Sequence, residues 1–296
     1  MSALSQRLGI ALLMLLASMF ASNHIAARLA FDHGTSVSAA VGVRSGVTAL
    51  AMVALLRLNG FALALPRATL ARGLGIGLLV ALQSFCLYSA VARIPVALAL
   101  LAFNTFPLLL VLLTWAATGE RPPRRALLAI PAALCGLVLA LDVVGSARAI
   151  AGRWAEIGGG VGFALGAACS FALVLFLTTH WLKQVDGRLR TLLMMGTTAV
   201  VVSGIGAATH ALALPADGEG WVGLALLTLL YGTAITVVFT VVPRLEAAST
   251  TVALNFEPVM ALFLGWAILG QAVAPRQILG AFLVVGAIVY LSTGRR

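Results

Sequence analysis

The chain has 296 residues, of which 61% are hydrophobic and only 9% are charged, and its mean hydropathy is +1.09. Those values exclude a soluble globular protein and are typical of a polytopic membrane protein. A net charge of +10 would favour nucleic-acid binding in a soluble chain, but here the arginines lie mostly in short breaks between apolar segments. In those breaks basic residues set topology and contact anionic lipid, so we expect a lipid bilayer as a partner and no nucleic acid.

About 20 apolar residues in a helix are needed to cross a bilayer, and ten segments of the chain meet that requirement. The first segment stays apolar past Phe20 without a clear cleavage site, so we interpret it as a retained helix and not as a signal peptide. The breaks are short and rich in turn residues, which leaves no room for an extramembrane domain. The predicted spans are 8–30, 36–56, 69–91, 94–117, 125–144, 157–181, 190–211, 220–242, 247–269 and 276–293.

Basic residues predict the orientation, because Lys and Arg in short loops stay on the cytoplasmic side. Thirteen of them fall on the side that holds the N-terminus, the even-numbered loops and the C-terminus. Five fall on the opposite side, and Arg44 lies inside the second predicted span. We therefore predict a multi-pass protein of the cytoplasmic (inner) membrane with both termini in the cytoplasm.

The sequence repeats itself at an offset of 151 residues. At this offset NTFPLLLVLLTWAATGE (104–120) aligns with NFEPVMALFLGWAILGQ (255–271), which pairs an asparagine, a proline, a tryptophan and a glycine in each copy. Apolar composition alone does not explain such agreement at a single offset. The chain is therefore predicted to contain two copies of one structural unit.

Each copy is predicted to hold five helices, the first in residues 1–148 and the second in 152–296. Because five is odd, the second copy must enter the membrane from the side opposite to the first. The expected fold class is an all-α membrane protein whose ten transmembrane helices form a 5+5 inverted-topology repeat. Transporters with this architecture place a binding site at the repeat interface and expose it to each side in turn.

Several stretches carry a family resemblance, namely FASN (20–23), Arg44 in the second span, YSAVARIPVALALLAFNTFP (88–107) and VVPRLEAASTTVALNFEP (241–258). Together they resemble the drug/metabolite transporter superfamily in its EamA-type branch, over nearly the whole chain. The resemblance implies an exporter of amino acids, other metabolites or drugs. Our preferred substrates are amino acids, in particular aromatic or other apolar ones, and the alternative is a drug or another metabolite such as a purine or a cationic compound.

Two charged side chains lie well away from the ends of the predicted spans, Glu257 near the middle of the ninth and Arg44 in the second. A carboxylate facing lipid there is disfavoured by about 2.5 to 3.5 kcal/mol, so we expect Glu257 to face the cavity between the copies. It can take up a proton, bind a substrate ammonium, pair with Arg44, or bond to its own unwound helix backbone. A zwitterionic substrate suits such a site, with Arg44 bound to the carboxylate. The first copy has Phe106 where the second has Glu257, so the sequence does not support a mechanism with two symmetric carboxylates.

Other polar side chains inside the spans are further candidates for substrate binding or proton coupling. Asn23 and His24 lie near the middle of the first span, and Gln83 and Tyr88 lie in the third. A histidine in this position serves as a proton relay or as hydrogen-bonded packing. Tyrosine offers an apolar surface with a polar tip, which suits the wall of a binding pocket.

Pro107 and Pro258 are candidates for hinges in the repeated element. Proline lacks an amide hydrogen and clashes with the carbonyl four residues earlier, so we expect a kink near the middle of each helix. Asn104 and Asn255, three positions before each proline, can donate to the freed carbonyls or line the cavity. The kinks are either static or the hinges of walls that move during alternating access.

The sequence has no Walker-type GxxxxGK[ST] phosphate loop, and its three cysteines lack metal-ligand spacing, so we expect neither cofactor nor metal. Few ionisable residues lie inside the spans, which ranks an intramembrane enzyme below a transporter. A channel also ranks lower, because it does not need an inverted repeat. The predicted function is secondary export of a small molecule, with protons as the candidate coupling ion.

Overall fold

The computed structural model describes residues 3–61, 65–119, 121–122, 124–140, 147–240, 257–271 and 274–292. These residues form helices joined by turns, with no strand among them, which confirms the all-α class. The helices are α1 (Ala3–Asp32), α2 (Val37–Leu58), α3 (Arg67–Arg93), α4 (Val96–Phe103), α5 (Phe106–Thr118), α6 (Arg124–Ala140), α7 (Ala147–Trp181), α8 (Gly187–Ala208), α9 (Gly218–Thr240), α11 (Glu257–Leu269) and α12 (Pro275–Ser292).

Seven stretches within the described residues are helical, long and apolar enough to cross a membrane. They are Ala11–Asp32, Val37–Leu58, Arg67–Arg93, Val96–Thr118, Ile157–Trp181, Gly187–Ala208 and Gly218–Val237. Three shorter apolar helices, α6, α11 and α12, coincide with the other predicted spans. Parts of the fifth, eighth, ninth and tenth predicted spans, namely residues 141–144, 241–242, 247–256 and 293, lie outside the described part. The protein is thus a multi-pass membrane protein, and ten crossings stay a prediction.

Helix boundaries repeat at the same offset as the sequence. The matched starts, each pair 151 residues apart, are Arg67 and Gly218 for α3 and α9, Phe106 and Glu257 for α5 and α11, and Arg124 and Pro275 for α6 and α12. The ends of α5 and α11 also match, because Gly119 and Gly270 follow them with φ of 73° and 61°. This left-handed conformation closes a helix and suits glycine, which has no Cβ. The sequence repeat is therefore a structural repeat.

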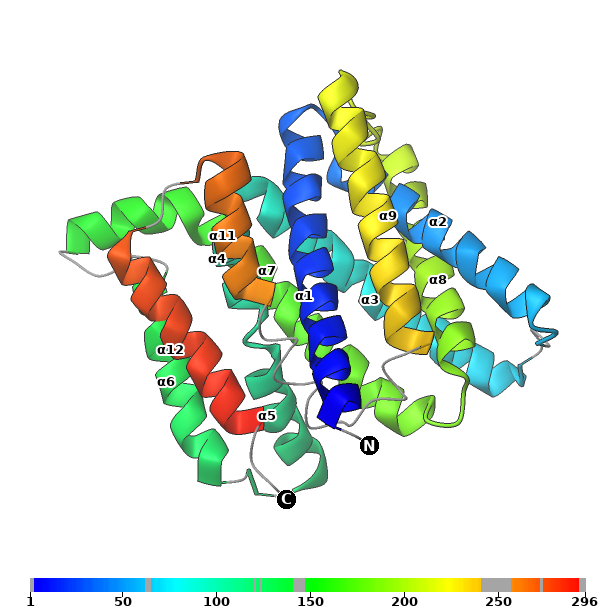
Figure 1. Ribbon diagram of the computed structural model, residues 1–296, viewed down its shortest axis with the longest axis horizontal. Helices are drawn as coiled ribbons and strands as arrows, with labels where there is room; N and C mark the ends of the chain where they lie inside the picture. The colour runs from blue at the N-terminus through cyan, green and yellow to red at the C-terminus, as the bar shows by residue number, and fades with distance from the viewer. Residues whose placement is uncertain are drawn as a thin grey trace.

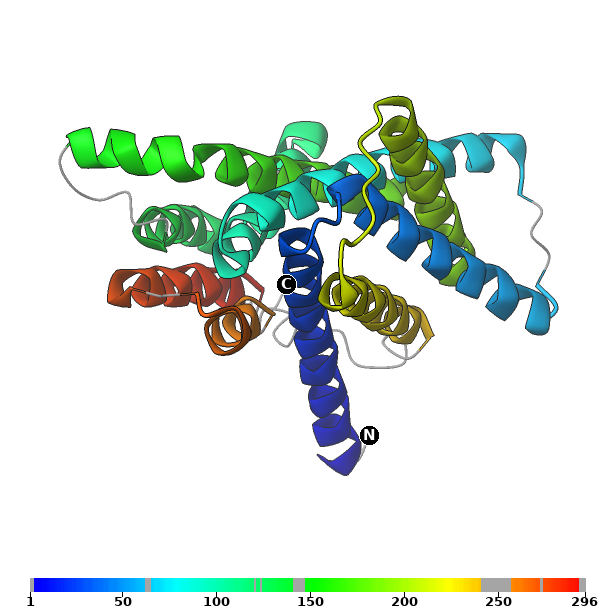
Figure 2. The same cartoon turned by 90° about the horizontal axis from the view of Figure 1, so that it is seen from above.

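The two copies pack against each other in a reciprocal pattern (Figures 1 and 2). The first helix of the first copy, α1, packs on α9, the third helix of the second copy, and in exchange α3 packs on α7. The contacts of α1 with α11 and of α7 with α5 form another exchanged pair. Helices α2 and α6 pack on their own counterparts, α8 and α12. A twofold relation between two similar units produces this exchange of contacts.

The first helices of the two copies cross steeply and slope in opposite vertical senses in Figure 1. Helix α1 rises from the lower edge, whereas α7 descends from the upper left towards the lower right. The start of α1 and the end of α12 both lie towards the lower edge. The turn between α1 and α2 and the start of α9 lie together at the upper edge.

Small residues allow the paired helices to approach closely. A Cβ atom at Gly136 of α6 would lie 2.8 Å from the carbonyl oxygen of Gly280 in α12, which is closer than real Cβ atoms come to such an oxygen. Between α2 and α8, a Cβ at Gly42 would collide with the hydroxyl of Ser203. Membrane helices lack a hydrophobic driving force for association, so such close backbone packing supplies much of their mutual attraction.

The fourth predicted span is interrupted and not merely kinked. Helix α4 ends at Phe103 and α5 begins at Phe106, with Asn104 and Thr105 in a turn between them. Pro107 is consequently the second residue of α5, where a missing amide hydrogen breaks no helical bond. The kink expected near the middle of this span thus takes the form of a two-residue break that ends just before Pro107.

Local side chains satisfy the carbonyls at this interruption. The Asn104 amide donates to the Leu100 carbonyl at 2.8 Å, and the Thr105 hydroxyl donates to the Ala102 carbonyl at 2.7 Å. A backbone break within a membrane needs such partners, because no water is present to replace the helical bonds. Pro258 is likewise the second residue of α11, and the residues before α11 lie outside the described part.

Candidate functional site

Arg44 lies near the middle of α2 and is 2% exposed. Its Nη1 donates to the Tyr88 hydroxyl and its Nη2 donates to the Ser84 hydroxyl, both at 3.1 Å. Tyr88 and Ser84 lie four residues apart on α3, which places them on the same face of that helix. The two hydrogen bonds therefore fix the plane of the guanidinium between α2 and α3.

Two aromatic rings lie against the guanidinium. Its central carbon lies 3.7 Å from the ring centre of Tyr231 in α9 and 4.7 Å from that of Tyr88. A cation over an aromatic face is stabilised by about 2 kcal/mol when both groups are desolvated. Since Tyr231 belongs to the second copy and Tyr88 to the first, Arg44 lies where the two copies meet.

Asn23 extends the network from α1. Its side chain and the Tyr88 hydroxyl are in hydrogen-bond contact, with Nδ2 at 3.0 Å and Oδ1 at 3.1 Å from the hydroxyl oxygen. Asn23 and Tyr88 are both buried, at 0% and 1% exposure. Asn23, Arg44, Ser84, Tyr88 and Tyr231 are called the Arg44 cluster from here on.

Glu257 is the first residue of α11 and lies beside His24 of α1. The distance from its Oε1 to His24 Nε2 is 3.4 Å, and 16% of the Glu257 side chain is exposed. The His24 ring is also 5.5 Å from the Tyr88 ring, so the acid and the Arg44 cluster are neighbours through His24. Arg44 and Glu257 form no ion pair with each other.

The corresponding position in the first copy is filled by aromatic rings. Phe106, the first residue of α5, makes an edge contact with Phe171 of α7 at 4.8 Å between ring centres. Phe103 lies 5.5 Å from both of these rings. Because α5 meets α7 as α11 meets α1, the Phe106 contact is the apolar counterpart of the Glu257–His24 contact.

The structure brings most of the predicted site residues together. Asn23, His24, Arg44, Tyr88 and Glu257 form a chain of contacts across α1, α2, α3 and α11. Gln83 joins at the edge, because its amide oxygen accepts a hydrogen bond from Ser84 at 3.4 Å. Asn104 is buried and bonds to its own helix, and Asn255 lies outside the described residues.

Sequence reasoning missed Tyr231. It is one of only three tyrosines in the chain, and it lies in the middle of a predicted span, as Tyr88 does. Because tyrosine is rare in this chain, its occurrence in the middle of a span could have pointed to Tyr231 as a site residue. The repeat pattern did not point to it, because the position 151 residues earlier is Val80.

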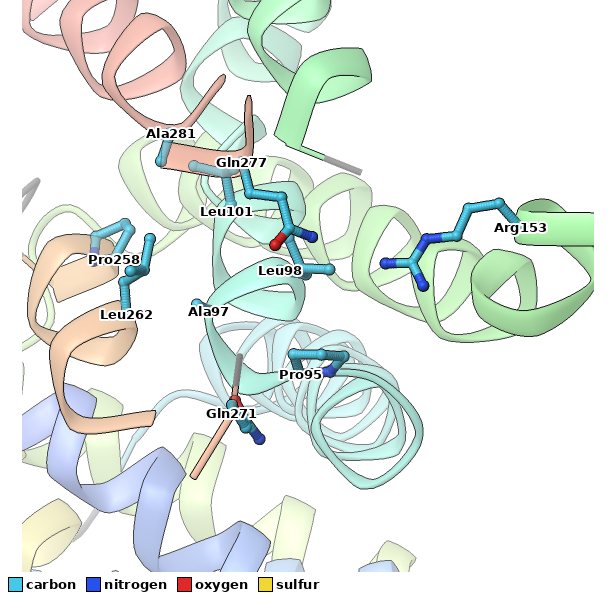
Figure 3. A pocket seen from close by; sticks show the side chains of 10 residues that line it. All are labelled: Pro95, Ala97, Leu98, Leu101, Arg153, Pro258, Leu262, Gln271, Gln277 and Ala281. Carbon is cyan, nitrogen blue, oxygen red and sulfur yellow. The ribbon is translucent and has the colours of Figure 1, made fainter. Parts of the chain in front are cut away.

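A cavity of about 190 Å³ lies beside α11 and is lined by α4, α7, α11 and α12 (Figure 3). Pro258, Leu262 and Ala281 form its apolar side in this view, and the side chains of Arg153 and Gln277 extend into it from other directions. Arg44 and Tyr88 do not line this cavity. This cavity therefore does not reach Arg44 or Tyr88, and Glu257 precedes Pro258, which is part of the cavity wall.

A second charged group lies at the edge of the molecule opposite to the two termini. It consists of His33, Asp217 and Glu219, and together with the backbone of residues 33–36 and 213–219 it is called the loop latch. His33, just after α1, has Nδ1 at 2.7 Å from Asp217 Oδ2 and Nε2 at 3.3 Å from Glu219 Oε2. The hydrogen bond with Asp217 raises the pKa of His33 above its ordinary value, and the charges of Asp217, Glu219 and Asp32 act in the same direction. The pKa of Asp217 is lowered, first by the Gly220 amide and then by His33.

Backbone hydrogen bonds reinforce the loop latch. The Ser36 amide donates to the Ala213 carbonyl, and the Ala216 amide donates to the His33 carbonyl, both at 3.0 Å. The Ser36 hydroxyl also accepts from the Ala213 amide at 3.0 Å. Residues 33–36 belong to the first copy and 213–219 to the second, so the latch joins the copies at this edge.

Within the described residues no group of three or more His, Cys, Asp or Glu side chains is arranged to hold a metal ion.

The fold and the site define a polytopic helical membrane protein made of two structural repeats, with charged and aromatic side chains buried where the repeats meet. The chain belongs to the EamA-like transporter family, whose model matches residues 7–141 and again 158–293. The two matches begin 151 residues apart, so each copy of the repeat carries one. The protein is therefore a membrane transporter of small molecules, in a family of transporters and not of enzymes.

Solved structures show the same fold at low sequence identity. Fifteen of their chains match this one. One of them, described only as "Crystal structure of protein", is 18% identical, covers 98% of this chain and 97% of its own, and has a TM-score of 0.59. No curated protein matches the chain.

Proposed function

We propose that this transporter exports amino acids, with a preference for aromatic or other apolar ones, across the cytoplasmic membrane by alternating access. In this account residues 1–148 and 152–296 are oppositely oriented halves with the substrate between them. The observation that carries the proposal is the reciprocal packing of α1 on α9 and of α3 on α7. When two similar halves exchange their conformations, the contacts on one side close as those on the other open, which gives two states of similar energy.

The direction of the helices supports the inverted arrangement. Helices α1 and α7 are the first of their copies, and in Figure 1 α1 rises while α7 slopes downward across the view. The start of α1 and the end of α12 lie on one side, as an even number of crossings requires. With thirteen of the basic residues assigned to that side by the sequence, we place both termini in the cytoplasm and the loop latch outside.

The chemistry of the interface supports an amino acid as the substrate. Arg44 supplies a cation from the first copy and Glu257 a carboxylate from the second, and the two are not paired with each other. An amino acid presents the complementary charges, an α-carboxylate and an α-ammonium, a few ångströms apart. The rings of Tyr88, Tyr231 and Phe106 offer apolar surface for its side chain.

Glu257 and His24 are the groups we assign to proton coupling. Their side chains are 3.4 Å apart at the interface of the two copies, and both are able to exchange a proton. In this scheme Glu257 binds either a proton or the substrate ammonium, so that the two compete for one carboxylate. Such competition links export of substrate to proton entry.

Counterflow into liposomes tests the proposal. Purified protein is reconstituted in vesicles loaded with unlabelled phenylalanine or leucine, and uptake of the labelled amino acid is followed with and without a pH gradient. We expect saturable uptake that internal substrate stimulates and a pH gradient modifies. Saturable counterflow of purines or cationic drugs in place of amino acids would reassign the substrate class, and non-saturable flux would indicate a channel.

A further inference from the structure

The charge of Arg44 has no acidic partner in the described part of the chain. The guanidinium is 2% exposed, yet its hydrogen bonds go to two neutral hydroxyls, those of Tyr88 and Ser84. No Asp or Glu of the described residues lies within ion-pair distance of it. Removing a cation from water is expensive unless it is paired or hydrogen-bonded, and two hydroxyls and two rings offset only part of that cost.

Arg44 has N–H donors that its two hydroxyl partners do not use, and one of them is on Nε. A guanidinium has five N–H donors, and two of them serve the hydroxyls of Tyr88 and Ser84. The Nε atom is buried with no hydrogen-bond partner. Nε and the adjacent Nη of an arginine form the fork that binds both oxygens of a carboxylate.

The surrounding side chains hold this fork in one orientation. Tyr231 and Tyr88 stack on the guanidinium at 3.7 and 4.7 Å, and Asn23 holds the Tyr88 hydroxyl in turn. Holding a flexible side chain in place beforehand lowers the entropy cost of binding a ligand. A buried, oriented and incompletely bonded guanidinium is what an anion-binding group requires and is more than helix packing requires.

We infer that Arg44 binds the carboxylate of the transported substrate through its Nε edge. The inference rests on the proposed transport function and narrows it to substrates that carry a planar carboxylate. In this scheme Arg44 binds the carboxylate of the substrate, and Glu257 binds either its ammonium group or a proton. Since the rings that cover Arg44 come from both copies, substrate that occupies the fork contacts both halves of the transporter.

Three related probes separate the two ends of an amino acid. Phenylalanine has both charges, phenylalanine amide lacks the carboxylate, and phenylpropionate lacks the ammonium. Each is tested as an inhibitor of counterflow and as a stabiliser of the purified protein against heat. We expect the amide to bind about ten- to a hundredfold more weakly than phenylalanine, the usual range for losing a charge-assisted hydrogen-bonded pair.

The Arg44→Gln variant should lose the same ten- to hundredfold affinity for phenylalanine and phenylpropionate, while affinity for the amide stays unchanged. Arg57→Gln, an exposed arginine on the same helix, is the matched control and should behave as the wild type. If Arg44→Gln does not fold, Arg44→Lys keeps the charge without the fork and should show an intermediate loss. Equal binding of acid and amide, or unchanged phenylalanine affinity in these variants, overturns the inference.

The heat-stability measurements test carboxylate binding by Arg44 independently of the proposed transport function. Arg44-dependent stabilisation by phenylpropionate without counterflow of any amino acid would leave the carboxylate site standing and reject amino-acid export. Amino-acid counterflow that the amide inhibits as well as phenylalanine does would support export and reject the role of Arg44. Stabilisation by none of the carboxylates also rejects it.

Discussion

The contact of α5 with α7 and the contact of α11 with α1 occupy equivalent places in the two copies, yet their chemistry differs. In the first, Phe106 packs on Phe171 with 4.8 Å between ring centres. In the second, Glu257 lies 3.4 Å from His24. Both helices begin at these residues and both carry a proline next, so the backbone is conserved between the copies while the side chains are not.

The difference shows what allows a carboxylate at this position. Phe106 and Glu257 each stand directly before a proline in matching helices, so the local backbone alone does not decide. The partner does, because His24 of the first copy has Leu175 as its counterpart in the second, and leucine cannot bond to an acid. The two copies thus have similar backbones but different side chains at this position. Phe106 and Phe171 are called the apolar wall, and Glu257 and His24 the charged wall.

The largest effect is expected when the charge is moved to the apolar wall. Phe106→Glu places a carboxylate among Phe103 and Phe171 without a partner, which should cost on the order of 2.5 to 3.5 kcal/mol. The melting temperature in detergent measures this, with Phe106→Leu as the milder control. Adding Leu175→His to Phe106→Glu recreates the histidine–acid pair and should recover part of the stability. A Phe106→Glu protein as stable as the wild type would show that the partner does not matter.

Neutralising the charged wall should change coupling more than folding. Glu257→Gln keeps the shape of the side chain, but it can no longer release a proton or pair with an ammonium. We expect stimulation by a pH gradient to disappear and the affinity for amino acids to fall about tenfold or more. Asp186→Asn, at an exposed loop position, is the control. Retained pH-gradient stimulation in Glu257→Gln would remove this residue from proton coupling.

The loop latch should respond to a change of pH by a few-fold change in opening. Because the pKa of His33 is raised in the latch, the contact is strongest below the ordinary histidine value of about 6.5 and weakens as pH rises through the raised value. Hydrogen exchange of residues 33–36 and 213–219 measures the opening. His33→Gln should make the exchange rates, once corrected for intrinsic exchange, independent of pH between about 5 and 8. The same pH response in wild type and variant would assign it to other groups.

The smallest effect is expected at the repeated prolines. Pro107 follows an interruption that Asn104 and Thr105 already stabilise, so Pro107→Ala should slow turnover by only about two- to fivefold through a more flexible helix start. Substrate affinity should stay unchanged. Turnover and affinity come from the same counterflow curves, and Pro95→Ala, before α4, is a matched control. A loss of turnover beyond about a hundredfold would mean that the proline itself is the hinge.

Sequence patterns predicted the parts of this protein that depend on local composition and internal comparison. Apolar length predicted the helices, and the 151-residue offset predicted the matching starts of α5 and α11. The cost of a charge in the membrane was enough to single out Arg44 and Glu257, because both lie inside apolar spans. Each of these deductions needs only one helix, or one alignment of the chain with itself.

Partner choice between helices was not predictable in the same way. The sequence left a pair of Arg44 with Glu257 open, whereas Arg44 contacts Tyr88 and Tyr231, and Glu257 contacts His24. Such contacts depend on how α1, α2, α9 and α11 are turned about their own axes relative to one another. The spacing of apolar residues along an almost wholly apolar helix does not predict that orientation. The interruption at Asn104 was missed for a related reason, because its side chain can either repair a kinked helix or end one.

Distances between the two copies at both edges of the membrane test alternating access most directly. After replacement of Cys86, Cys135 and Cys169, spin labels are attached at Asp32 and Leu214 for the latch edge, and in a second protein at Leu58 and Trp181 for the opposite edge. We predict that an amino-acid substrate or a change of pH shortens one distance while it lengthens the other. Two distances that stay fixed, or that change together in the same direction, would contradict alternating access.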